Sequence, residues 1–157
     1  MSLALILIVS LLGVKPCASY QNRVDDTLKR LFDDRSPILI DIDGDSKPDT
    51  IMPRVYTVKS SRDAPGRGST GARESHWITF DLKTSRGRTL KSLFRYEYGT
   101  DEADYWVYAL VPCEANRDGR IDLLFYSGDD TSDERVVLLN RRGRFSVHSR
   151  KVSRDDN

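Results

Sequence analysis

The chain has little cysteine, little histidine and almost no net charge: among 157 residues there are two cysteines and two histidines, and the formal charge is +1. Two cysteines cannot build the disulfide framework on which many small secreted domains depend. A near-neutral chain has no overall field that would recruit nucleic acid or an anionic membrane. The sequence also lacks a Gly-x-Ser-x-Gly motif, a Walker loop and a cysteine–histidine pair of catalytic spacing. These absences favour a single non-enzymatic domain held by its own core.

Long hydrophobic runs are absent as well, since the longest, residues 3–14, is too short to cross a bilayer. Its length suits the apolar part of a signal peptide, and small residues follow at positions 17–19. We therefore predict a signal peptide over residues 1–19, a mature chain that starts near Tyr20, and a secreted or periplasmic protein with no integral membrane segment after cleavage. A retained membrane anchor is the alternative. Cleavage at this point leaves Cys113 alone and predicts no disulfide within the chain.

The apolar pattern predicts one short helix followed by strands. Residues 22–35 carry apolar side chains at helical spacing, which predicts an amphipathic helix that caps a sheet. The remainder has β-forming segments joined by short turns, and strands without helices between them favour antiparallel sheets. We thus expect an all-β, mostly antiparallel domain over residues 20–157. Its strands are expected at about 37–40, 50–58, 76–82, 90–98, 105–111, 121–126, 135–140 and 145–148.

Two acidic loops, residues 41–49 and 114–122, are the most informative segments. Both place oxygen-bearing side chains at loop positions 1, 3, 5 and 9 and lead into an apolar segment. These side chains are Asp41, Asp43, Asp45 and Asp49 in the first loop, and Glu114, Asn116, Asp118 and Asp122 in the second. Carboxylates this close repel one another unless a cation lies among them, and calcium takes 6–8 oxygen ligands of these kinds. The spacing predicts two calcium loops in internal repeats of about 37–112 and 113–150.

Each loop also has a reading without metal. The first could be a tight Asp/Gly turn with solvated acids. In the second, Arg117 or Arg120 could neutralise the acids instead of a cation. The first loop carries more negative charge, so we expect it to be the tighter calcium site.

With these motifs the chain resembles the FG-GAP/VCBS repeat, the calcium-loop unit of integrin α-chain β-propellers and of many secreted bacterial proteins. The family pattern is Asp-x-Asp/Asn-x-Asp-Gly-x-x-Asp before an apolar strand, with a later strand that ends in Asn-x-x-Gly-x-Phe. The second loop matches at Asn116, Asp118, Gly119 and Asp122, and the later pattern at Asn140, Gly143 and Phe145. It departs from the pattern at Glu114. The first loop has all four aspartates but carries Ser46 where the family prefers glycine, at a position that often needs a permissive backbone.

The resemblance implies propeller-blade-like sheets and calcium bound by the side chains at positions 1, 3, 5 and 9. It also implies a ligand at position 7, the backbone carbonyl of Lys47 in the first loop and of Arg120 in the second. The chain has material for about one and a half blades, whereas a propeller needs at least four. A propeller closed within one chain is therefore not expected.

Together these observations predict a calcium-binding module, with a mainly structural metal, that binds a protein or glycan. One alternative is a small secreted hydrolase that uses the acidic loops, although calcium with all-protein ligands is a poor generator of nucleophiles. Another is an inhibitor or adhesion protein that contacts partners through the Arg-rich loop 59–73. A set of basic residues near the C-terminus could contact a polyanion, but it is interpreted as an exposed basic edge that discourages strand pairing: Arg141, Arg142, Arg144, Arg150 and Lys151. Neither the ligand nor the oligomeric state follows from the sequence.

Overall fold

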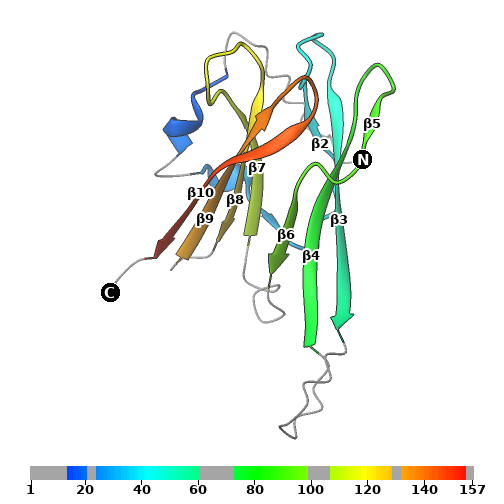
Figure 1. The fold of residues 1–157 in the computed structure, drawn as a ribbon, viewed down its shortest axis with the longest axis vertical. Helices are drawn as coiled ribbons and strands as arrows, with labels where there is room; N and C mark the ends of the chain where they lie inside the picture. Colours follow the sequence, from blue (N-terminus) through cyan, green and yellow to red (C-terminus); the bar gives the residue numbers. More distant parts are fainter. Residues whose placement is uncertain (1–13, 21–23, 61–72, 99–106, 129–131, 155–157) are drawn as a thin grey trace, which may run out of the picture.

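The computed structural model describes residues 14–20, 24–60, 73–98, 107–128 and 132–154. In these residues the chain forms two antiparallel five-stranded sheets, and its only helical elements are short 3-10 turns (Figure 1). Neither sheet closes on itself. The predicted all-β antiparallel fold is confirmed. The strands are β1 (Arg30–Leu31), β2 (Ile38–Ile40), β3 (Asp49–Ser60), β4 (Arg73–Lys83), β5 (Thr89–Leu90), β6 (Arg95–Tyr98), β7 (Val107–Cys113), β8 (Asp122–Gly128), β9 (Ser132–Asn140) and β10 (Phe145–Arg154).

The two sheets share one pattern of connection. One sheet has the order β2-β3-β4-β5, with β6 also paired to β4, and the other has the order β1-β7-β8-β9-β10. Each contains a meander of four antiparallel strands, β2 to β5 and β7 to β10. The first hairpin of each meander carries an acidic loop, and the last turns at a glycine with positive φ, Gly87 (82°) or Gly143 (81°). All four connections lie at the same end of the molecule, at the top of Figure 1.

The inner faces of the two sheets share one hydrophobic core. Alternation along β8 shows how the sheet divides its side chains: Leu123 and Phe125 enter this core, while Leu124 and Tyr126 join a second cluster. Rings from both sheets meet in the core, with Phe80 of β4 5.7 Å from Tyr108 of β7 between centroids. Burial of each such side chain stabilises the fold by roughly 1.5–3 kcal/mol. The shared core therefore holds the two repeats, and their loops, together.

The helix predicted over residues 22–35 is wrong for its described part, residues 24–35. This stretch forms a 3-10 turn, η3 (Asp26–Leu28), and then β1, which pairs with β7. The reason lies in where its apolar side chains are buried. Val24 packs into the second cluster and Phe32 into the shared core. The apolar side chains of this segment are thus buried in two different clusters. An extended chain can place them in both clusters, whereas one face of a helix would place them in the same one.

Cys17 and Cys113 form a disulfide, contrary to the expectation that Cys113 stands alone. The segment around Cys17, including η2 (Cys17–Tyr20), packs against the start of the second acidic loop. The Cys17 N–H donates to the Glu114 carbonyl (2.9 Å), and the Glu114 N–H donates to the Lys15 carbonyl (3.0 Å). A chain cleaved near Ser19 would lack this bond. Disulfides persist in oxidising compartments, so the bond is typical of an extracytoplasmic protein.

Among the described residues, no helix is both long and apolar enough to cross a membrane. Residues 1–13, which contain most of the predicted signal peptide, lie outside the described residues. So do residues 61–72, the larger part of the Arg-rich loop.

The strand predicted over residues 90–98 is interrupted. It divides into β5 and β6 because Ser92 adopts a φ of 53° and leaves the extended conformation. Its N–H donates to Asp81 Oδ1 (3.0 Å), and the next N–H, of Leu93, donates to the Phe80 carbonyl (2.8 Å). Bonds to β4 therefore hold the chain on the sheet across the break.

Candidate functional site

The first acidic loop, residues 41–49, turns around the carboxylate of Asp41. Its Oδ1 accepts the Gly44 N–H and its Oδ2 accepts the Ser46 N–H, both at 2.8 Å. Gly44 and Ser46 have φ values of 74° and 64°, in the left-handed region. The position where the family prefers glycine thus does adopt a conformation that is costly for Ser46. This backbone curls the loop around the Asp41 carboxylate.

Asp49, the last residue of the loop, bonds back to the start of the loop. Its side chain is fully buried, with Oδ2 accepting the Ile42 N–H (2.9 Å) and Oδ1 accepting the Ser85 N–H (2.7 Å). Burial raises the pKa of the Asp49 carboxyl, and the charges of Asp43 and Asp41 act in the same direction against the two hydrogen bonds. Asp41, Asp43 and Asp49 each place one carboxylate oxygen within 4.8 Å of the others. This donor set fits a hard cation.

Asp45 faces the neighbouring turn rather than these three carboxylates. Its Oδ2 accepts the Ser85 hydroxyl (2.7 Å) and lies 3.3 Å from Arg86 Nε, while its Oδ1 accepts the Lys47 N–H (2.9 Å). The Ser85 hydroxyl is the main reason that the pKa of Asp45 lies below its ordinary value. Asp45 is thus held beside the predicted site by a residue 40 positions away in the sequence.

The second loop, residues 114–122, repeats this backbone. Asp122 is fully buried and accepts the N–H of Ala115 (2.9 Å) and of Asn140 (2.8 Å), as Asp49 does with Ile42 and Ser85. Positions 4 and 6 again have positive φ, with Arg117 at 60° and Gly119 at 75°. Each loop therefore has a glycine at only one of its two left-handed positions, and not at the same one.

The side chains of the second loop are arranged differently. Asp118 Oδ2 accepts the Asn116 amide (3.2 Å) and lies 3.5 Å from an Arg120 guanidinium nitrogen. Glu114 Oε1 is 3.4 Å from the Gly119 N–H, longer than the matching contact of Asp41. In the described part of the chain, only the first loop gathers three or more acidic, histidine or cysteine side chains at metal-binding range. In the second loop, the Asn116 amide and the Arg120 guanidinium thus partly take the place that a cation would occupy beside Asp118.

Sequence reasoning missed the residues that join each loop to the turn after its third strand. Ser85 and Arg86 contact the first loop from the β4–β5 turn. In the second repeat Asn140 links its loop and turn, because its side chain also donates to the Ile121 carbonyl (3.1 Å) and accepts the Gly143 N–H (2.7 Å). Two signals in the sequence point to these roles: the Arg-Gly-Arg sequence that both turns carry, at 86–88 and 142–144, and, in the second repeat only, the Asn140 and Gly143 of the Asn-x-x-Gly-x-Phe pattern.

Comparison of the chain with protein-family models, with curated proteins and with solved structures finds no match.

Proposed function

We propose that this protein is a secreted or periplasmic calcium-binding module of FG-GAP/VCBS type, with the first acidic loop as its principal metal site. The observation that carries the proposal is the approach of Asp41, Asp43 and Asp49, whose ligand oxygens lie within 4.8 Å of one another. Two of these carboxylates are buried, so their mutual repulsion is poorly screened by water. A bound dication would offset it.

Calcium suits this loop better than magnesium. It accepts many oxygen ligands in a flexible geometry, whereas magnesium demands a tight octahedron and gives up water reluctantly. The three clustered aspartates, Asp45 and the carbonyl of Lys47 would hold the ion. In the second loop Glu114, Asn116, Asp118, Asp122 and the carbonyl of Arg120 would form a weaker site. The metal's role would be structural, because ions that bind only the folded state add their binding energy to folding.

A module of this kind serves to present a binding surface, and we propose a protein or glycan as its ligand. The disulfide supports a location outside the cytoplasm. The small-hydrolase alternative would need a metal-bound water placed beside a general base. Nothing in the described geometry singles out such a pair, so the binding role is the better supported proposal.

Thermal melts test the metal site directly. We expect excess calcium to raise the melting temperature above that in metal-free buffer, and magnesium to raise it less. When free calcium is 100 times its Kd, the gain in free energy of unfolding is about 2.7 kcal/mol. Identical melts with and without calcium would sink the proposal.

A further inference from the structure

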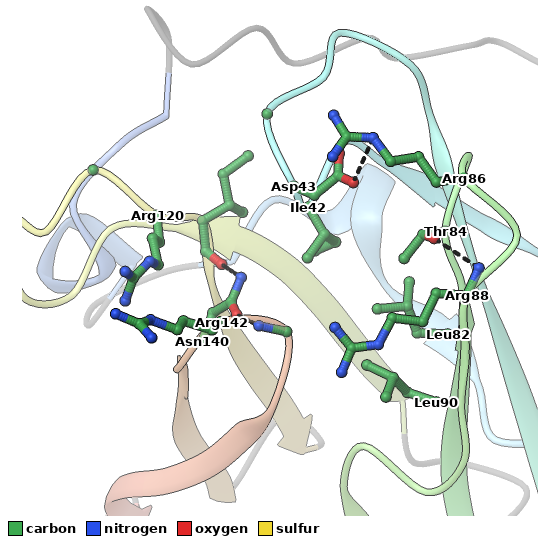
Figure 2. A pocket seen from close by; sticks show the side chains of 14 residues that line it. Ile42, Asp43, Leu82, Thr84, Arg86, Arg88, Leu90, Arg120, Asn140 and Arg142 are labelled. Atoms are coloured by element: carbon green, nitrogen blue, oxygen red, sulfur yellow. Dashed lines mark hydrogen bonds and ion pairs between the residues drawn. The ribbon is translucent and has the colours of Figure 1, made fainter.

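A cleft of about 440 Å³ lies where the two repeats meet, at the end that carries both acidic loops (Figure 2). Its volume falls in the range of small-molecule sites. Each repeat contributes its acidic loop and its Arg-Gly-Arg turn to the walls. Apolar side chains also line the cleft, and they are Ile42, Leu82, Leu90 and Ile121.

The polar lining is strongly cationic. Four arginines line the cleft, Arg86 and Arg88 from one repeat and Arg120 and Arg142 from the other, against the single carboxylate of Asp43. Two of the four already have partners: Arg86 lies 3.3 Å from Asp45, and Arg120 lies 3.5 Å from Asp118. Arg88 and Arg142 pair with no carboxylate anywhere in the described ranges.

Arg88 reaches across the cleft. In Figure 2 its guanidinium extends from the β4–β5 turn into the space between the repeats. One of its nitrogens lies 3.0 Å from the point that a Cβ on Gly143 would occupy, so it meets the opposite turn. Glycine at position 143 leaves this approach open. Arg142, the neighbour of Gly143, brings a second unpaired positive charge to the same turn.

We propose that this cleft binds an oxyanion group carried on a small apolar body. Guanidinium groups present paired N–H donors that match carboxylate and phosphate oxygens. A concave wall with an excess of positive charge focuses the field and attracts an anion. The leucine and isoleucine side chains supply the surface on which an apolar body would be buried. The cleft's volume and the Asp43 carboxylate in its wall favour one small anion over an extended polyanion.

The test is a titration of isotope-labelled protein with phenyl phosphate and with phenylacetate, followed through the backbone amide signals of Gly119 and Gly143, which line the cleft. Benzyl alcohol is the neutral comparison. We expect saturable shifts with the anions, and the tighter of the two distinguishes a phosphate group from a carboxylate. Arg88→Gln and Arg142→Gln should each weaken binding about tenfold, the usual worth of a charged hydrogen bond.

Arg144→Gln is the matched control, because Arg144 belongs to the same turn as Arg142 but does not line the cleft. Its affinity for the probes should equal that of the parent chain. The proposal is overturned if benzyl alcohol binds as tightly as the anions, if no probe saturates, or if Arg144→Gln weakens binding as much as Arg88→Gln. The amide spectrum also verifies that each variant is folded. All titrations use metal-free buffer, so the result does not depend on whether the acidic loops bind calcium.

Discussion

Asp49 and Asp122 occupy equivalent places in the two repeats, and each carboxylate joins its own loop to a distant turn. Asp49 accepts the N–H of Ile42, at loop position 2, and that of Ser85, in the β4–β5 turn. Asp122 accepts the N–H of Ala115, at the same loop position, and that of Asn140, at the end of β9. Both side chains are fully buried. A buried carboxylate is costly unless it is hydrogen-bonded. These bonds make loop position 9 an anchor of the fold in both repeats, so position 3 is the better place to test metal binding alone.

Asp43→Ala should abolish most of the calcium-dependent rise in melting temperature, whereas Asn116→Ala at the same loop position should leave most of it. The reason is that Asp43 belongs to the cluster of three carboxylates, and Asn116 is engaged with Asp118. Calorimetric titration of both variants with calcium measures the effect. A tighter site that survives in Asp43→Ala but is lost in Asn116→Ala would reverse the proposed order of the loops.

Ser46→Gly should stabilise the domain by up to about 1 kcal/mol, because glycine adopts the left-handed conformation of this residue without steric cost. Ser46→Ala retains a Cβ and is the control; it should bring no gain. Urea unfolding at constant m-value gives the comparison. Equal stabilities for the glycine and alanine variants would mean that the positive φ of Ser46 carries no strain.

Most of the strands and both acidic loops could be predicted from the sequence. The alternation of side chains in a strand and the spacing of carboxylates in a loop depend only on residues that are close together in the chain. The roles of Ser85 and Arg86 were not predictable in this way, since they contact the first loop only after β3 and β4 pair. The false helix has the same origin: the spacing from Val24 to Phe32 fits a helix, yet tertiary packing sends the two side chains into different clusters. The disulfide was missed because the expected cleavage site removed Cys17 from consideration.

Loss of the disulfide should cost roughly 2–5 kcal/mol of unfolding free energy, because the bond closes a long loop of the unfolded chain. Its cysteines are 96 residues apart in sequence. The double variant Cys17→Ser/Cys113→Ser measures this in denaturant, with chemically reduced parent protein as a second route to the same state. An unchanged unfolding midpoint in both would contradict the expectation.

The disulfide also predicts where the mature chain starts. N-terminal sequencing of the native protein should find a first residue at or before Cys17, because a chain cleaved near Ser19 would lack this cysteine.

Alkaline pH should destabilise the protein through Tyr108. Burial raises the pKa of this phenol to about 12, and its hydroxyl donates to the Asp34 carbonyl (2.9 Å). The folded pKa lies above the unfolded value of about 10, so the contribution is complete below pH 10 and is lost as the pH rises toward 12. Its size is roughly 2–3 kcal/mol. Stability of Tyr108→Phe, which cannot ionise, should fall less over this interval; parallel curves would refute the assignment.

Calcium should strengthen the binding of phenyl phosphate to the cleft, if both proposals hold. Arg86 lies 3.3 Å from Asp45 and 3.8 Å from Asp43, and a dication on these carboxylates would release it to the cleft it lines. Coupling of this kind is reciprocal, so the anion should also tighten calcium binding. Arg86→Gln should reduce the coupling while both ligands still bind. Titration of each ligand in the presence of the other measures it, and equal affinities in all cases would exclude it.

Because Cys17 is attached to the start of the second loop, reduction of the disulfide should affect the two repeats differently. Glu114 exchanges backbone hydrogen bonds with Lys15 and Cys17 and directly follows Cys113, whereas the contacts described for the first loop come from its own repeat. A reducing environment would therefore loosen position 1 of the second loop and leave the first loop's carboxylates in place. A change in redox conditions would then act on one repeat and leave the metal ligands of the other unaffected.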